Sequence, residues 1–273
     1  MDLEEVSRIF SISDLPKFIS GVEREFLKAR TNDKLLKQAV TRAFNLGGRR
    51  LRPILLFGVS TTCDVYQKRL LIKGGAAIEL VHQASLIHDD IIDKSRLRRG
   101  EPTMAAAEGQ DTALLAGDYM IASGLGLAAK VGPQVVDILS QAIERMCEGQ
   151  FRELDIPRIK ALDDKYIDIA RSKSAALISA ACKIGGIIRD FSGSDTAALG
   201  RFGENFGIAF QIIDDVIDDD FRPNDIKAAL DAAKKYVQLA EMNLAGTSTK
   251  VNTVGLADFI SQYSNYSLSL KKP

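Results

Sequence analysis

Long helix-compatible stretches with few interruptions are the feature that most restricts how this chain can fold. Prolines stand at only seven of the 273 positions, namely 16, 53, 102, 133, 157, 223 and 273. Between them, apolar residues recur every three or four positions, for example over 77–91 and 199–217, which is the period of a helix with one buried face. No alternating apolar and polar runs joined by Gly-Asn or Asn-Gly turns indicate strands. The sequence therefore predicts an all-α fold.

The interruptions are short, which favours one domain over several. Turn residues gather at 45–48, 94–102, 131–133, 154–158 and 189–195, and these segments are the predicted helix boundaries. No internal repeat is evident, so a solenoid is not expected. We expect residues 1–273 to form a single helical domain. From about residue 246 the chain is rich in Ser, Thr and Asn, and we expect a weakly held C-terminal tail over 246–273.

Charge and cysteine content exclude several classes of protein. The 36 basic residues balance the 36 acidic residues, so a broad electrostatic surface for nucleic acid is not expected. Cys63, Cys147 and Cys182 are odd in number and far apart, which argues against a disulfide framework or a zinc site and indicates a reducing, cytoplasmic location. The N-terminus is acidic where a signal peptide is basic, and no transmembrane segment is expected.

Aspartate is unusually frequent and is concentrated in two clusters. It supplies 24 of the 36 acidic residues, although Glu is the better helix former. The first cluster is His88-Asp89-Asp90-Ile91-Ile92-Asp93, and the second runs from Gln211 through Asp214-Asp215-Val216-Ile217-Asp218 to Asp220. Both contain the pattern D-D-x-x-D. Each cluster interrupts a strongly apolar run, which distinguishes it from an ordinary polar helix face.

The spacing within each cluster indicates a metal site. Residues four apart lie on one helix face, so Asp89 shares a face with Asp93, and Asp214 shares one with Asp218. Carboxylates that project from apolar helices repel one another and need a compensating cation or full hydration. Their oxygens suit Mg²⁺, which commonly bridges to phosphate. Two other interpretations stay open at this point: a solvated acidic face, and acidic N-cap residues at two helix starts.

Arginines lie in two segments that complement the carboxylates. One is Gly-Gly-Arg-Arg-Leu-Arg-Pro at 47–53, and the other, at 96–100, directly follows the first Asp cluster. Arg binds phosphate bidentately and stays charged. A metal site alone needs no cations beside it, whereas a metal–diphosphate site does. His82 and His88 are poorer ligands beside hard carboxylates, and a structural role is the alternative for each.

Together these residues resemble the trans-isoprenyl (polyprenyl) diphosphate synthases, which condense isopentenyl diphosphate with an allylic diphosphate. The resemblance runs from about residue 46 to residue 218. It rests on 47–53, on 87–93 followed by 98–103, on Gly149-Gln150, on Lys173-Ser174 and on 210–218. The arginines and the second D-D-x-x-D make terpene cyclases of the same fold less similar. The resemblance implies a helical bundle around a large central cavity, Mg²⁺ with up to three ions per site, and a homodimer.

The resemblance also implies roles for individual residues. The implied Mg²⁺ ligands are Asp89, Asp93 and Asp214, with Asp90, Asp215 and Asp218 supporting them. The residues implied to hold the allylic diphosphate are Arg98 and Lys173, and those implied to hold isopentenyl diphosphate are Arg49, Arg52, His82 and Arg99. The implied catalytic residues around the reacting centre are Lys173, Ser174 and Gln211.

Three departures from the family pattern bear on activity. Arg49 stands where the family usually has Lys, and the C-terminal region is short. A Gly-Lys and Asp-Leu segment that closes over the diphosphate is missing after the second Asp cluster, where Arg222 and Lys227 are the cations considered as substitutes. A non-catalytic regulatory subunit of a prenyl synthase therefore stays open as an alternative. An acidic Mg²⁺- or Ca²⁺-binding helical protein would leave the arginines unexplained.

The helix before Asp89 gives an expectation for product length. Ser85 lies one turn back, about 6 Å away at 1.5 Å per residue, and Ala84 lies beside it. In the family a bulky aromatic residue at this depth stops elongation early, whereas both residues here are small. We expect a product of C25 or longer. A geranylgeranyl (C20) diphosphate synthase is the alternative, since a bulky residue on another helix could close the tunnel while Ala84 and Ser85 only permit close packing.

Overall fold

Helices make up nearly all of the computed structural model, which describes residues 2–28, 31, 33–45, 47–155, 161–221 and 225–269. The α-helices are α1 (Leu3–Ile9), α2 (Leu15–Phe26), α3 (Lys34–Asn45), α4 (Leu51–Gly58), α5 (Val65–Ile92), α6 (Met104–Glu108), α7 (Gln110–Ala129), α8 (Pro133–Glu153), α9 (Asp164–Ala170), α10 (Ala176–Ile188), α11 (Gly193–Ile217), α12 (Ile226–Met242) and α13 (Thr253–Ser269). A π-helix, η1 (Arg171–Ala175), joins α9 to α10. The predicted all-α fold is confirmed.

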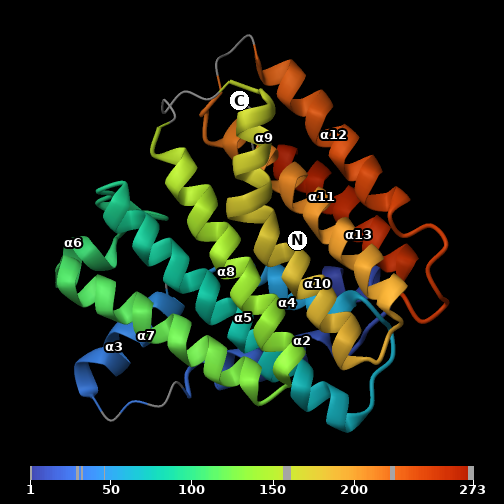
Figure 1. The fold of residues 1–273 in the computed structure, drawn as a ribbon, viewed down its shortest axis with the longest axis horizontal. Coiled ribbons are helices and arrows are strands. Elements are labelled where there is room, and N and C mark those ends of the chain that lie inside the picture. Colours follow the sequence, from blue (N-terminus) through green and yellow to red (C-terminus); the bar gives the residue numbers. More distant parts are fainter. Residues whose placement is uncertain are drawn as a thin grey trace.

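Two helices, α5 and α11, organise the bundle (Figure 1). Helix α5 packs against α2, α4, α7 and α10, and α11 packs between α10 and α12. The 28 residues of α5 begin at a capping box, in which the Asp64 side chain accepts from the Gln67 backbone N–H and the Gln67 side chain accepts from that of Asp64. The capping box defines the residue at which α5 begins, and the first Asp cluster lies at the other end of this helix.

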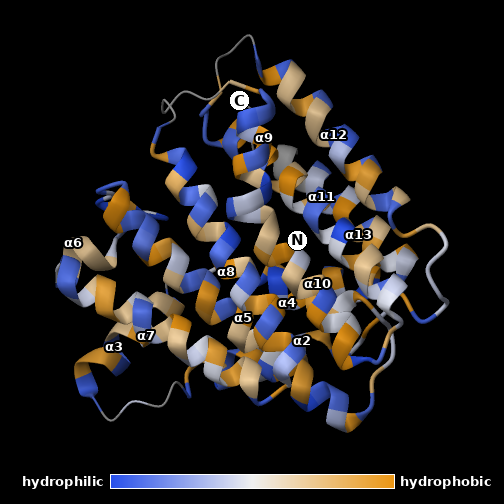
Figure 2. Cartoon of the chain, in the orientation of Figure 1, coloured by the Kyte–Doolittle hydropathy of each residue, from blue (hydrophilic) through white to orange (hydrophobic). Residues whose placement is uncertain are grey.

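Apolar residues from most of the helices of the bundle fill one large core. Phe10, Phe18, Phe57, Phe202 and Phe206 are among its largest fully buried side chains. A second, smaller cluster surrounds Tyr166 and Phe221 between α9, α11 and α12. In Figure 2 hydrophobic and hydrophilic residues are mixed along α8 and α12, which bury one face, whereas nearly all residues of α10 are buried.

The predicted boundaries agree with the helix ends where the structure describes them. The segments 94–102, 131–133 and 189–195 separate or begin helices, whereas residue 46 and residues 156–158 of two other predicted breaks lie outside the described residues. One short hairpin was not predicted. It pairs β1 (Leu97–Arg98) with β2 (Glu101–Pro102) directly after α5.

The weakly held tail over 246–273 stays a prediction, and part of it is helical. Residues 253–269 form α13, which packs against α11, α12 and α4. Leu256, Phe259, Ile260 and Tyr263 are each at most 6% exposed. These four apolar residues recur at helical spacing, so the segment buries a continuous face despite its Ser, Thr and Asn content. Residues 270–273 lie outside the described part of the chain.

Two helices, α5 and α7, are long and apolar enough to pass a length-and-composition test for a membrane span. Core helices of folded proteins pass the same test. In α5, 67% of the most apolar window is buried inside the fold, against 39% in α7. Helix α5 is therefore accounted for by the core, and α7 keeps a partly uncovered apolar surface.

Candidate active site

The two Asp clusters occupy the C-terminal ends of α5 and α11. Asp93 and Asp218 are the C-cap residues of these helices, and each is followed by a residue with positive φ, Lys94 at 52° and Asp219 at 58°. Backbone N–H groups then close matching Schellman motifs, Ser95 N to Asp90 O and Asp220 N to Asp215 O, both at 2.9 Å. The interpretation of these clusters as N-caps is therefore wrong.

This placement is electrostatically unfavourable for carboxylates. The C-terminus of a helix carries partial negative charge, and the last turn of neither helix contains a basic residue. Partial enclosure by protein, and then the charges of Asp218 and Asp215, raise the pKa of Asp214 to about 6. Burial is also the main cause that raises the pKa of Asp89. Burial therefore disfavours the ionised form of a carboxylate at each helix end, and a bound cation would stabilise that form.

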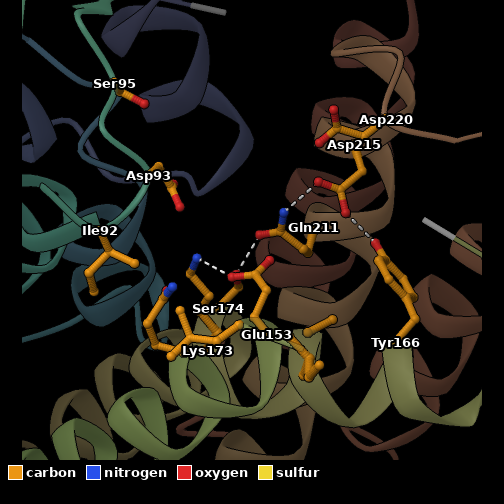
Figure 3. A pocket seen from close by; sticks show the side chains of 14 residues that line it. Ile92, Asp93, Ser95, Glu153, Tyr166, Lys173, Ser174, Gln211, Asp215 and Asp220 are labelled. Carbon is orange, nitrogen blue, oxygen red and sulfur yellow. Dashed lines mark hydrogen bonds and ion pairs between the residues drawn. The ribbon is translucent and has the colours of Figure 1, made fainter. Parts of the chain in front are cut away.

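A cavity of about 720 Å³ separates the two helix ends. In Figure 3, Asp93 and Ser95 lie on one side of it, Asp215 and Asp220 on the other, and Lys173 and Ser174 between them. The lining residues are Ile92, Asp93, Ser95, Gln150, Glu153, Leu154, Tyr166, Ile169, Ala170, Lys173, Ser174, Gln211, Asp215 and Asp220. One cavity thus joins residues of both clusters to the Lys-Ser pair that the sequence singled out.

Lys173 reaches the first cluster from the π-helix η1. Its Nζ lies 2.5 Å from a Glu153 carboxylate oxygen and 3.6 Å from Asp89 Oδ2, and these two acids outweigh burial and raise the pKa of Lys173. A Cβ on Gly149 would lie 2.7 Å from the Lys173 backbone nitrogen, so only glycine lets α8 approach η1 this closely. The sequence motif at Gly149 is therefore a packing requirement that sets the position of Lys173.

A chain of hydrogen bonds links η1 to the second cluster. The Ser174 hydroxyl donates to Gln211 Oε1, and Gln211 Nε2 donates to Asp215 Oδ1 at 2.9 Å. The Tyr166 hydroxyl donates to Asp215 Oδ2 at 2.6 Å. Asp215 is 3% exposed, whereas the neighbouring Asp214 is exposed. The two adjacent carboxylates are therefore held in different environments.

The hairpin after α5 positions the second arginine segment. Arg99 and Gly100 both have positive φ, 54° and 82°, which makes the two-residue turn type I′. Arg98 contacts the buried Asp90 carboxylate bidentately, with Nε and Nη2 at 3.0 and 2.9 Å from Oδ1 and Nε at 3.0 Å from Oδ2. Arg99 Nη1 donates to the Gly47 carbonyl at 2.5 Å. The left-handed conformation of Arg99 is thus held by a contact to the other arginine segment.

The three arginines at 49–52 have different surroundings. Arg50 is buried, and its guanidinium contacts Glu79 at 2.9 Å and Glu23 at 3.3 Å. Arg49 Nη1 donates to the Tyr263 hydroxyl at 2.8 Å. Arg52 has a buried Nε with no hydrogen-bond partner within the described residues, and burial lowers its pKa. Arg52 therefore has an unsatisfied donor that an anion would satisfy.

The structure places Asp93, Lys173, Ser174, Gln211 and Asp215 around one cavity, whereas the predicted arginines, His82, Asp89 and Asp214 are not among its lining residues. The positive charges of Arg49 and Arg52 oppose the rise in the pKa of Asp214. The charges of Arg52 and Arg99 disfavour protonation of His82. Burial, and then these arginines, hold the pKa of His82 well below its usual value, so His82 is neutral at pH 7. Within the described residues, no three His, Cys, Asp or Glu side chains converge closely enough to hold a metal ion by themselves.

The two predicted product-length residues lie outside the cavity lining. Ala84 is fully buried in the core, and the partly buried Ser85 donates its hydroxyl hydrogen to the His82 carbonyl at 2.8 Å. Of the two cations considered after the second cluster, Lys227 is exposed on α12, and Arg222 lies outside the described residues.

Sequence reasoning missed Glu153, Tyr166, Glu79 and Tyr263. Glu153 lies one turn after Gly149, and Tyr166 lies two turns before Lys173, so helical spacing from two identified motifs could have indicated both. Glu79 lies one turn before Gln83, which donates to it at 2.9 Å. For Tyr263 no local signal exists, since it reaches Arg49 across 214 positions of sequence.

Comparison with known proteins identifies relatives. Residues 33–231 match the model of the family described as polyprenyl synthetase. The nonaprenyl diphosphate synthase of Mycobacterium tuberculosis is 33% identical over 193 residues, 70% of this chain and 57% of that protein. A geranylgeranyl diphosphate synthase of Sulfolobus acidocaldarius is 36% identical over 67% of this chain and 58% of its own length. The chain thus spans less than two thirds of the length of these curated relatives.

Solved structures share the fold over nearly the whole chain. A polyprenyl synthase from Caulobacter crescentus, complexed with calcium and isoprenyl diphosphate, superposes with a TM-score of 0.83 at 21% identity, over 99% of this chain and 98% of that chain. A decaprenyl diphosphate synthase from Rhodobacter capsulatus gives a TM-score of 0.78 at 22% identity, with both chains fully covered. On the match over residues 33–231, the chain belongs to the polyprenyl synthetase family.

Proposed function

We propose that this chain is a cytoplasmic, Mg²⁺-dependent trans-prenyltransferase that condenses isopentenyl diphosphate with an allylic diphosphate. The observation that carries the proposal is the placement of Lys173 between two carboxylate-bearing helix ends around one cavity of about 720 Å³. The relatives named above include a nonaprenyl and a geranylgeranyl diphosphate synthase, so the reaction class is common to both while the product length differs.

The donor set fits Mg²⁺ and a diphosphate together. Asp89 and Asp93 from α5 and Asp214 from α11 would be the direct ligands, with Asp90, Asp215 and Asp218 supporting them, for up to three ions. Because the carboxylates do not converge on one point by themselves, diphosphate oxygens would complete the coordination, as is usual for Mg²⁺. When bound, Mg²⁺ would supply the positive charge that stabilises diphosphate as it leaves.

The basic residues divide into two groups that suit two diphosphates. Lys173 and Arg98, beside the first Asp cluster, would hold the allylic substrate. Arg49, Arg52, Arg99 and His82 would hold isopentenyl diphosphate. The unsatisfied Arg52 Nε supports this assignment, and the neutral His82 would contribute a hydrogen bond without further charge.

The proposed reaction uses these positions. Cleavage of the allylic C–O bond leaves an allylic cation and diphosphate, and the double bond of isopentenyl diphosphate attacks that cation to form the new C–C bond. A proton is then lost, and we assign it to the departed diphosphate. Ser174 and Gln211, which line the cavity beside Lys173, would orient the reacting ends. Holding both substrates makes the attack effectively unimolecular.

The direct test is incubation with labelled isopentenyl diphosphate, an allylic primer and Mg²⁺, followed by chromatography of the dephosphorylated products. We expect elongation in five-carbon steps to C25 or longer. Products that stop at C20 would support the geranylgeranyl alternative. Absence of elongation, with intact diphosphate binding, would contradict the enzymatic proposal.

A regulatory subunit is the second candidate, and a specific observation favours it. The family's Lys-containing segment is missing after the second cluster, and Lys227 is exposed on α12. A relative at 34% identity is the heptaprenyl diphosphate synthase component 2 of Bacillus subtilis, whose name indicates a multicomponent enzyme. Co-incubation with a catalytic synthase would then change that synthase's product distribution although this chain has no turnover of its own.

We also propose that the chain forms a homodimer through α7. Leu114 and Leu115 on this helix are 49% and 64% exposed, which leaves an apolar strip uncovered. A symmetric pairing of two copies would bury this strip. Light scattering coupled to size-exclusion chromatography should give twice the 29.8 kDa mass of the chain. A monomer at micromolar concentration would contradict this assignment.

A further inference from the structure

We propose that Tyr166 is a positioning residue for the second Asp cluster, which holds Asp215 so that the cluster can bind a Mg²⁺–diphosphate. This inference rests on the proposed function and deepens it. The Tyr166 hydroxyl lies 2.6 Å from Asp215 Oδ2, and both residues line the cavity (Figure 3). Tyr166 belongs to none of the sequence motifs and lies seven residues before the Lys173-Ser174 pair.

The contacts of Asp215 fix its orientation from two sides. Tyr166 donates to Oδ2, and Gln211 Nε2 donates to Oδ1 at 2.9 Å. The orientation of the Gln211 amide is determined as well, since its Oε1 accepts from the Ser174 hydroxyl. A carboxylate with a donor on each oxygen and 3% exposure cannot rotate freely. Asp215 is therefore held by α9, η1 and α11 together.

Tyr166 can act only as a donor in this arrangement. Asp215 Oδ2 is a carboxylate oxygen, so the Tyr166 hydroxyl supplies the proton of this hydrogen bond. Its ring packs edge-on against Phe221, with ring centroids 5.2 Å apart. The hydroxyl thus directs a neutral hydrogen bond at Asp215 and adds no charge to the cluster.

The consequence for the neighbouring carboxylates is geometric. Asp214 and Asp215 are adjacent on α11, so their side chains point about 100° apart. Asp215 is fixed by Tyr166 and Gln211, whereas Asp214 is exposed and is the one we assign as the direct ligand. Outer partners of this kind orient the groups that touch the metal, and their loss typically weakens metal affinity about 10–100-fold.

A matched pair of variants separates this role from simple packing. Tyr166→Phe removes the hydroxyl and keeps the ring. Tyr236→Phe makes the same change on α12 in the same apolar cluster, where the hydroxyl makes no hydrogen bond within the described part of the chain. Phe221→Leu removes the packing partner of Tyr166 and keeps the hydroxyl.

The measurement is calorimetric titration of inorganic pyrophosphate at a series of fixed Mg²⁺ concentrations, with thermal midpoints recorded for every variant. We expect Y166F to weaken pyrophosphate binding about tenfold and to need more Mg²⁺, while Y236F and F221L bind like the wild type. In a D215N background, Y166F should have no further effect, because Tyr166 acts through that carboxylate.

The outcomes distinguish this inference from the function on which it rests. Wild-type protein that binds no Mg²⁺–pyrophosphate would overturn the proposed function itself. If the wild type binds and Y166F binds equally well, the positioning role alone is overturned. The same holds if F221L weakens binding as strongly as Y166F does. If Y166F does not fold, D215N carries the test, and binding equal to the wild type in D215N would overturn the inference.

Discussion

At the residue scale, the site is defined by carboxylates at positions where helices disfavour them. Asp89 and Asp93 end α5, and Asp214 and Asp218 end α11, each at the negative pole of a helix. Such placement costs stability in the absence of a cation. Replacing one of these aspartates should therefore raise the stability of the metal-free protein and reduce its function.

Asp89→Ala tests this signature directly. Turnover should fall on the order of 10²–10³-fold, because the charge that organises the metal is lost. The thermal midpoint without metal should stay equal or rise slightly, since a carboxylate leaves a helix C-terminus. Asp137→Ala, an exposed position on α8, is the control and should change neither quantity. Retained turnover in D89A would contradict the metal assignment.

Asp214 gives a pH dependence of stability with a defined sign. Its pKa is raised to about 6 in the folded chain, mainly by burial, from the 3.8 of an unperturbed aspartate, so between these values the folded state binds more protons than the unfolded state. Stability from this group therefore falls as pH rises from 4 to 6.

Asp214→Asn removes this contribution. The lowered pKa of His82 gives stability a pH dependence of opposite sign, but His82 is present in both proteins and therefore cancels in the difference between them. Without metal, D214N should unfold at a higher temperature than the wild type at pH 7.5, and the difference should shrink towards pH 4.5. Differential scanning calorimetry at both pH values measures it. A difference that does not vary with pH would show that Asp214 titrates normally.

At the scale of elements, buried ionic contacts fix the start of α4 against α5. Arg50 has positive φ, is 7% exposed and contacts Glu79, which is 3% exposed. The Phe44 ring also lies 4.7 Å from its guanidinium. Arg50 therefore supports the turn from which Arg49 and Arg52 project, and it is not itself assigned to substrate.

Glu79→Gln should be strongly destabilising, because it leaves a buried guanidinium without its closest anion. Loss of one partner of a buried pair costs about 3 kcal/mol or more. Glu25→Gln is the control, since its partner Lys28 is 70% exposed, and such surface pairs contribute about 0–1 kcal/mol. Urea unfolding of both variants measures the two costs. Equal costs would contradict the structural role of Glu79.

Sequence was sufficient for the elements wherever periodicity was strong. The apolar spacing predicted α5 and α11, and the D-D-x-x-D spacing predicted carboxylates on one face. It did not reveal that both clusters end their helices, because Lys94 and Asp219 take the left-handed position where glycine is the usual signal. For α13 the helical spacing of Leu256, Phe259 and Tyr263 was present but was outweighed by the polar composition around it.

At the scale of the whole molecule, the question is where a growing hydrocarbon would lie. The cavity is at the Asp end of α5, and the helix continues about 42 Å in total at 1.5 Å per residue. Ala84 is fully buried in the core, so an aromatic residue there would overpack it. Ser85 is partly buried and is the better position at which to probe the path.

Ser85→Phe should shorten the product by at least one five-carbon unit, because the ring would block the face of α5 directly below Asp89. Chromatography of the dephosphorylated products measures the distribution. Leu86→Phe is the matched control, since residue 86 points about 100° away on the same helix and should leave the distribution unchanged. An unchanged distribution in S85F, with normal turnover, would mean that the hydrocarbon leaves α5 and runs instead past Leu154, which caps α8, and Ile169 of α9, two apolar residues that line the cavity.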